Sequence, residues 1–244
     1  CISSAASDVY KRQVYARWTK AYLKNVDMFA CITEFQKKKL IEAGYDKNKI
    51  TVIPNSIDAP CSYTPTTGGY IAYIGRLSYE KGYDLLVEVA RKHPEIKFCF
   101  AGAQREKNNT EIPKNVEFKG YLPKKELSKF IQESRFIVIP SRCYEGFPMA
   151  ILEAACHGKP AIAPNHGGFT EIIGQGENAI GKLFEPGNTD DLDKQIAELW
   201  NNQTLIEELG EKAFKKLKEH YDSEVVYKQW ETLFSNLKAP DIDR

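Results

Sequence analysis

The sequence predicts an α/β protein built around a doubly wound parallel sheet, and three observations support that class. Short apolar runs rich in β-branched residues alternate with helical patterns, as in parallel sheets that helices cover on both faces. Charged loops that contain glycine follow two of these runs, at the edge where open α/β sheets bind ligands. The 244 residues are 42% hydrophobic and 27% charged, which is enough apolar material for a buried core.

Residues 1–13 are interpreted as an artefact and not as part of the fold. The run from Ser3 to Gln13 corresponds codon by codon to a transposon adapter used in preparing sequencing libraries, and the chain does not start with Met. Under this interpretation the natural sequence begins mid-gene, near Val14. The alternative is a genuine leader, rich in Ser and Ala, that matches the adapter by chance.

Residues 14–57 predict a compact α/β unit in which helices and strands alternate. The expected elements, in order, are a helix, a strand, a helix and a strand at 14–24, 27–32, 34–42 and 49–53. Residues 58–69 are rich in Pro, Ser, Thr and Gly and therefore predict a linker.

Residues 70–222 predict the larger domain, with six strands mostly separated by helical patterns. The expected strands lie at 70–75, 97–101, 115–119, 135–140, 159–163 and 179–184. Connections between parallel neighbours should be right-handed. Residues 223–244 predict a final helix and a tail. The last helices are expected at 189–201, 204–219 and 223–237.

One strand-to-helix segment carries two glutamates eight positions apart. Pro148 suits the first turn of a helix at 149–156, and Gly158 suits the left-handed cap at its end. Glu145 then lies just before the helix and Glu153 lies within it. Free amides at the helix start suit a phosphate and carboxylates suit hydroxyls, so the segment predicts a site for a nucleotide or a sugar phosphate. The alternative is a pair of solvated surface glutamates.

A second loop at the same edge carries the complementary charge. Arg76 and Lys81 lie five positions apart between a predicted strand and a predicted helix, where the two cations together would neutralise a diphosphate. Gly75 and Gly82 would allow the backbone to approach closely. The alternative is a solvated basic loop in which Glu80 happens to pair with a neighbouring cation.

Both segments, in this order and at this spacing, resemble the retaining glycosyltransferases of family 4, also called group 1. That family has the GT-B fold, in which two Rossmann-like domains face each other across a cleft. The resemblance runs from about residue 22 to the last helix and also includes segments 52–58 and 165–171. It implies that 14–57 is the remnant of an N-terminal acceptor-side domain and that 70–222 is the donor-binding domain. The last helix would return to the N-terminal domain.

The resemblance implies a role for each candidate residue. Arg76 and Lys81 would bind the donor diphosphate, Glu145 would contact the transferred sugar, and these three are the expected catalytic residues. Glu153 would bind the ribose, and the backbone of the Gly120–Leu122 loop would lie against the base. The expected donor-binding residues are Gly75, Gly146, Phe147, Pro148, Met149, Ala150, Glu153, Tyr121 and Leu122.

The implied reaction moves a sugar from a nucleotide-diphosphate sugar to a glycan or lipid-linked acceptor with retention of anomeric configuration. The expected setting is bacterial cell-surface polysaccharide synthesis in the cytoplasm, with peripheral contact at the inner face of the cell membrane. UDP or GDP is the expected nucleotide. No other cofactor and no metal are expected, since no Asp-x-Asp motif lies near the proposed phosphates and Asp241-Ile-Asp243 lies in the tail. This fragment is expected to be inactive alone.

Two other classes stay open, a related enzyme that epimerises or hydrolyses nucleotide sugars and a noncatalytic nucleotide-sugar-binding module. An NAD dehydrogenase is disfavoured because no Gly-x-Gly-x-x-Gly motif follows a predicted strand. A net charge of +1 gives no reason to expect nucleic acid as a partner. Six cysteines without a Cys-x-x-Cys pair suggest neither a zinc site nor a disulfide scaffold. No run approaches the roughly 20 apolar residues that span a bilayer.

Overall fold

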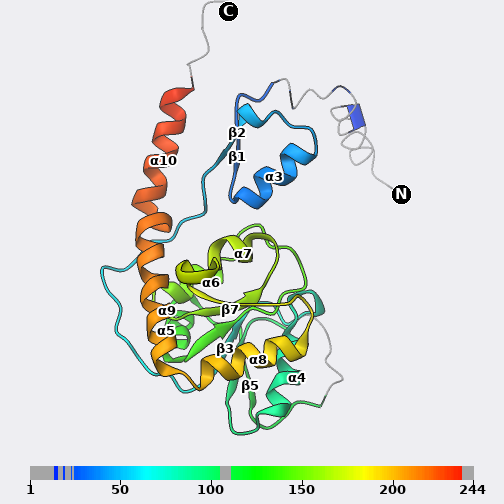
Figure 1. Ribbon diagram of the computed structural model, residues 1–244, viewed down its shortest axis with the longest axis vertical. Helices are drawn as coiled ribbons and strands as arrows, with labels where there is room; N and C mark the ends of the chain where they lie inside the picture. The colour runs from blue at the N-terminus through cyan, green and yellow to red at the C-terminus, as the bar shows by residue number, and fades with distance from the viewer. Residues whose placement is uncertain (1–13, 16–18, 20–22, 24, 105–110, 238–244) are drawn as a thin grey trace, which may run out of the picture.

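The computed structural model describes residues 14–15, 19, 23, 25–104 and 111–237. The segment interpreted as an adapter product, most of the predicted helix at 14–24 and the Asp-x-Asp tail lie outside the described residues. A small unit with two strands stands above a larger unit with a six-stranded sheet, and a long C-terminal helix rises beside both (Figure 1).

The large sheet is parallel throughout and has the strand order β5-β4-β3-β6-β7-β8, which confirms the predicted doubly wound class. The chain order reverses between β3 and β6, which lie side by side at the centre of the sheet. The two loops with candidate residues follow these two strands, so they meet at the topological switch point. The strands are β3 (Ile71–Ile74), β4 (Phe98–Ala101), β5 (Val116–Gly120), β6 (Phe136–Val138), β7 (Ala161–Pro164) and β8 (Gly181–Phe184).

Helices cover both faces of this sheet. Alternate strand residues point to opposite faces, so Ile71 and Phe98 belong to one buried cluster while Ala72 and Cys99 belong to the other. The first cluster includes residues of α4 (Tyr83–Lys92) and α8 (Thr189–Trp200), and α9 (Gln203–Lys216) contributes to both clusters. The second cluster also includes residues of three other helices. Those three are α5 (Lys124–Glu133), α6 (Met149–Ala155) and α7 (Gly167–Ile173).

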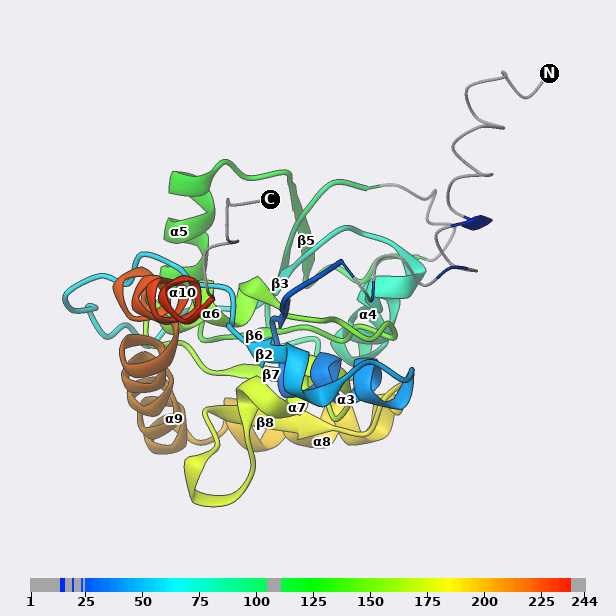
Figure 2. The same ribbon diagram turned by 90° about the horizontal axis from the view of Figure 1, so that it is seen from above.

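The small unit pairs β1 (Phe29–Cys31) in parallel with β2 (Ile50–Val52), and α3 (Glu34–Glu42) connects them. Thr33 caps α3, because its side chain accepts a hydrogen bond from the Gln36 amide. Seen from above, α3 lies next to α7 of the large unit (Figure 2). The carboxylate of Glu171 in α7 accepts hydrogen bonds from the first two amides of α3, at 3.0 and 3.1 Å.

The last helical pair differs from its prediction in one detail. The helix expected at 204–219 ends its α-helical part earlier, as α9 (Gln203–Lys216), and continues as one π-helical turn (Leu217–Tyr221). Leu217 and Tyr221 are both buried in that turn, and Asp222 then begins α10 (Ser223–Asn236). The carbonyl of Tyr221 accepts a hydrogen bond from the amide of Ile57, which holds the residue just before the linker against the turn.

Candidate functional site

The loops after β3 and β6 are packed backbone against backbone. Gly82 has a left-handed φ of 69°, and a Cβ placed there would lie 1.8 Å from the carbonyl oxygen of Pro140. Only glycine fits that contact, so the close approach at Gly82 is one between two segments of the chain. The amide of Arg142 also donates to the carbonyl of Glu80 at 2.9 Å. The switch point therefore joins the two candidate segments directly.

The structure brings Lys81 and Glu145 together at this point. Lys81 Nζ lies 2.7 Å from Glu145 Oε1, and their side chains are only 24% and 21% exposed. Arg76 Nη2 lies 2.7 Å from Glu80 Oε1 in the preceding turn, and both of those side chains are 45% exposed. The Glu80 pairing that the sequence left open is thus present, with Arg76. Each candidate cation carries a carboxylate partner that a diphosphate could replace.

Tyr73 lies beneath this charged cluster. Its hydroxyl donates to the carbonyl of Arg76 at 2.7 Å, and the residue is 1% exposed. Burial raises the Tyr73 pKa, and the nearby carboxylate of Glu145 raises it further. The phenol therefore stays protonated, and its hydrogen bond to the Arg76 carbonyl holds the start of the loop in place.

The start of α6 is covered by two neighbouring elements. Gly168 of α7 donates its amide to the carbonyl of Glu145 at 3.0 Å, and a Cβ on Gly146 would lie 2.4 Å from the side chain of Gln36 in α3. Phe147 packs its ring against Tyr221 in the core. Met149 and Ala150 form the first turn of α6, where amides have no acceptor within the helix. Pro148 stands just before them in an extended conformation.

Glu153 lies apart from the Lys81–Glu145 pair. It lines a cavity of about 270 Å³ together with Lys124 and Leu127 of α5. Burial raises the pKa of Glu153, and Lys124 opposes that shift. Tyr121 and Leu122 precede α5, where Tyr121 is exposed and Leu122 is packed against the core. The predicted ribose and base residues therefore lie near the start of α5.

His166 belongs to the core side of the site. Its ring lies 4.8 Å from that of Tyr144 and 5.7 Å from that of Phe169, measured between centroids. Burial lowers the His166 pKa, so a neutral ring is favoured. The His166 ring is therefore packed against two aromatic neighbours.

Sequence reasoning missed a third ion pair at the site, between Arg142 and Asp84. Arg142 forms a bidentate salt bridge with Asp84, in which both Nη–Oδ distances are 2.7 Å. Its guanidinium lies 3.9 Å from the centroid of the Tyr79 ring. The only available signals were that Arg142 follows β6 and that Asp84 opens a helix. Neither signal pairs two residues 58 positions apart.

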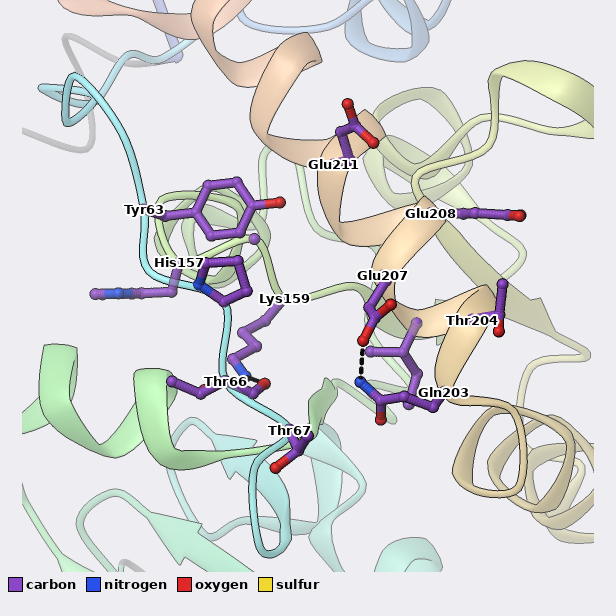
Figure 3. Close-up of a pocket in the computed structure, with 13 residues that line it drawn as sticks. Tyr63, Thr66, Thr67, His157, Lys159, Gln203, Thr204, Glu207, Glu208 and Glu211 are labelled. Atoms are coloured by element: carbon purple, nitrogen blue, oxygen red, sulfur yellow. Dashed lines mark hydrogen bonds between the residues drawn. The ribbon is translucent and has the colours of Figure 1, made fainter.

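A separate pocket of about 540 Å³ lies away from these loops, before the start of β7 (Figure 3). The linker supplies Tyr63 and Thr66 to it, and α9 supplies carboxylates such as Glu207. Lys159 is 3% exposed and donates to the carbonyl and hydroxyl of Thr66 at 2.7 and 2.8 Å. Burial lowers the Lys159 pKa to about 8. The hydrogen bonds from Lys159 hold the linker at Thr66, and none of the candidate donor residues lines this pocket.

The described residues contain neither a metal centre nor a membrane-spanning helix. No group of three or more His, Cys, Asp or Glu side chains among them could hold a metal ion. In the same part of the chain, no helix has both the length and the apolar character needed to cross a membrane.

Two family models match the sequence. The model for glycosyl transferases group 1 matches residues 62–216, and the model for glycosyltransferase family 4 matches residues 6–59. An uncharacterized glycosyltransferase of Methanocaldococcus jannaschii is 32% identical over 219 residues, which are 85% of this chain and 60% of that protein. The chain spans less than two thirds of the length of this relative and of two proteins from a cps region of Klebsiella pneumoniae.

Solved structures share the fold. Anabaena HepE in complex with UDP superposes with a TM-score of 0.78 at 19% identity, covering 86% of this chain and 64% of that one. A variant of Staphylococcus aureus TarM in complex with UDP and alpha-GlcNAc-glycerol superposes with a TM-score of 0.71 at 27% identity, covering 88% and 46%. These neighbours confirm the predicted GT-B type of α/β architecture.

Proposed function

The chain belongs to the glycosyl transferases group 1, and on that premise we propose that it moves a sugar from a nucleotide-diphosphate sugar to a glycan or lipid-linked acceptor. The observation that carries the proposal is the ion pair of Lys81 and Glu145 at the switch point of the sheet. A cation for the leaving diphosphate and a carboxylate for the sugar stand next to each other there, at the edge where such sheets bind nucleotides.

In the proposed mechanism, Arg76 and Lys81 bind the diphosphate and neutralise the charge that develops as the nucleotide departs. Guanidinium and ammonium groups so placed do the work that a metal ion does in other transferases. Amides from Gly146 to Ala150 add donors to the sugar phosphate, beside the backbone of Gly75.

Donor binding exchanges the partners of these charges. When the diphosphate takes Lys81, the carboxylate of Glu145 loses its 2.7 Å partner and becomes available to the hydroxyls of the transferred sugar. Glu145 then orients the sugar and stabilises the positive anomeric centre of the transition state. Attack takes place on the face that the nucleotide leaves, so the anomeric configuration is retained. No covalent bond to Glu145 is invoked.

The nucleotide part is proposed to occupy the region around the start of α5. Glu153 accepts the ribose hydroxyls, and the backbone of Tyr121 and Leu122 lies against the base. UDP or GDP is the proposed nucleotide, and the UDP in the 27% identical TarM complex supports the first.

The acceptor and the cellular setting are also proposals. Relatives include a poly(ribitol-phosphate) alpha-N-acetylglucosaminyltransferase of Staphylococcus aureus and a protein from a cps region of Klebsiella pneumoniae. These names support bacterial cell-surface polysaccharide synthesis in the cytoplasm, with peripheral contact at the membrane. The chain spans only part of the length of such relatives. We therefore propose that this chain by itself binds the donor nucleotide but does not catalyse transfer of the sugar.

Calorimetric titration of the chain with UDP, GDP and ADP tests the proposal. Saturable heat that depends on the base is the expected result, because a specific site buries the diphosphate and reads the base. A folded chain that binds none of the three would contradict the donor site. The full-length protein, supplied with the matching nucleotide sugar and a glycan acceptor, should form a product with the donor's anomeric configuration. An epimerised or hydrolysed donor would instead identify a related enzyme.

A further inference from the structure

Arg142 joins the two loops of the candidate site through five contacts. Its Nη1 and Nη2 each lie 2.7 Å from one oxygen of Asp84, and Nη1 also donates to the carbonyl of Tyr79 at 2.6 Å. The guanidinium covers the Tyr79 ring at 3.9 Å, and the backbone amide donates to the carbonyl of Glu80 at 2.9 Å. The Arg142 side chain is 22% exposed, so these contacts are partly shielded from water.

These contacts surround Lys81 in the sequence. Tyr79 and Glu80 precede Lys81 within one 3₁₀ turn, and Asp84 follows it in the first turn of α4. Arg142 itself stands three positions before Glu145. Arg142 therefore links residues on both sides of Lys81 to the loop that presents Glu145, through two backbone carbonyls before Lys81 and the Asp84 carboxylate after it. We call this set of contacts the tie.

We propose that Arg142 is a positioning residue for the donor diphosphate, holding the Arg76–Gly82 loop against the Glu145 loop so that Lys81 faces the site. The proposal rests on the proposed function. Arg142 acts through geometry, since the carboxylate of Asp84 already neutralises its charge through both Nη atoms. Lysine would supply the charge but not the planar fork, and it could not stack on Tyr79 in the same way.

The test compares three variants of the chain, Arg142→Met, Arg142→Lys and Asp84→Asn, with Arg91→Met as a matched control on the same α4 helix. Titrations with UDP and UMP, or with GDP and GMP if the chain selects guanine, give the ratio of diphosphate to monophosphate affinity. We expect each of the three variants to lower that ratio about tenfold, the factor that one hydrogen bond to a charged group supplies. Arg91→Met should leave the ratio unchanged. A variant that is only less stable would weaken both nucleotides equally.

Amide hydrogen exchange provides a second readout that needs no nucleotide. The amides of Lys81 and Gly82 donate within the loop, to the carbonyls of Ser78 and Tyr79 at 3.0 Å each. Loss of the tie should increase their exchange rates about tenfold in Arg142→Met, while amides of the central strand β3 keep their protection.

The outcomes separate this proposal from the one it rests on. An unchanged affinity ratio in Arg142→Met, or full recovery by Arg142→Lys, would overturn the positioning role. If the wild-type chain binds no nucleoside diphosphate, the proposed function fails, and faster exchange at Lys81 and Gly82 would still establish the tie. Unchanged exchange at those two amides would overturn the tie itself.

Discussion

Lys81 and Glu145 stand 64 positions apart in the sequence, and their side chains form an ion pair with 2.7 Å between Nζ and Oε1. Arg76 is paired as well, with Glu80. Both cations that would bind the diphosphate are therefore already paired with carboxylates of the chain. A ligand at this site must replace existing partners, so the measured affinity will report a difference between two sets of ion pairs.

Removal of the Arg76 guanidinium tests the diphosphate site. Arg76→Ala should weaken UDP binding about 10- to 100-fold, because a hydrogen bond to a charged group contributes roughly 1.5–3 kcal/mol. Calorimetric titration measures the loss. Arg91→Ala removes the same charge from α4 and should bind UDP like the wild-type chain. Equal affinity in Arg76→Ala and wild type would remove Arg76 from the site.

Glu153 should show opposite effects on stability and on binding. Burial raises its pKa, so the folded chain favours the protonated form and its ionisation costs stability as the pH rises above the ordinary range of a glutamate. Glu153→Gln should therefore raise Tm at pH 7 by about 2–4 °C, as ~1 kcal/mol does in a chain of this size, and the gain should shrink at pH 4. UDP affinity should fall in the same variant. A variant with both properties unchanged would speak against a buried ribose carboxylate.

Gly82 should tolerate no side chain. A Cβ there lies 1.8 Å from the carbonyl oxygen of Pro140 at a left-handed φ, so Gly82→Ala should cost more than ~2 kcal/mol of unfolding free energy in urea. Gly187 is the matched control, because it also has a left-handed φ, of 77°, and a Cβ placed there would meet nothing within 4 Å. Gly187→Ala should cost only about 1 kcal/mol. Similar costs at both positions would mean that the two loops can move apart.

Lys159 should make stability depend on pH in the alkaline range. Burial lowers its pKa to about 8, so the unfolded chain binds the proton more tightly and folding gains stability as the pH rises from about 8 towards 10.5. Over that window the wild type should gain on the order of 3 kcal/mol relative to Lys159→Met. Urea unfolding at pH 7.5 and pH 10 measures the change. Parallel pH profiles for the two proteins would show that the ammonium is solvated.

Local patterns predicted the elements well because each element carries its own signal. The helix expected at 34–42 is α3, with the same bounds, and the left-handed φ of 60° at Gly158 matches the predicted cap beyond α6. The strands were found from their apolar runs, with ends that differ by one or two residues. The sheet edge that carries Lys81 and Glu145 follows from the parallel class alone.

Contacts between distant segments could not be predicted in the same way. The contact between Arg142 and Asp84 depends on how β6 sits beside β3, and no local pattern encodes that register. The cavity around Glu153 likewise depends on how α5 and α6 pack. The π-helical turn at Leu217–Tyr221 has the composition of an ordinary helix, so the sequence predicted one.

The hydrogen bonds from α3 to Glu171 join the small unit to α7 of the large unit. Both are exposed, so water can replace the carboxylate at the Glu34 and Phe35 amides with little change in free energy. The contact therefore orients α3 on α7 while it contributes little to the free energy that holds the two units together.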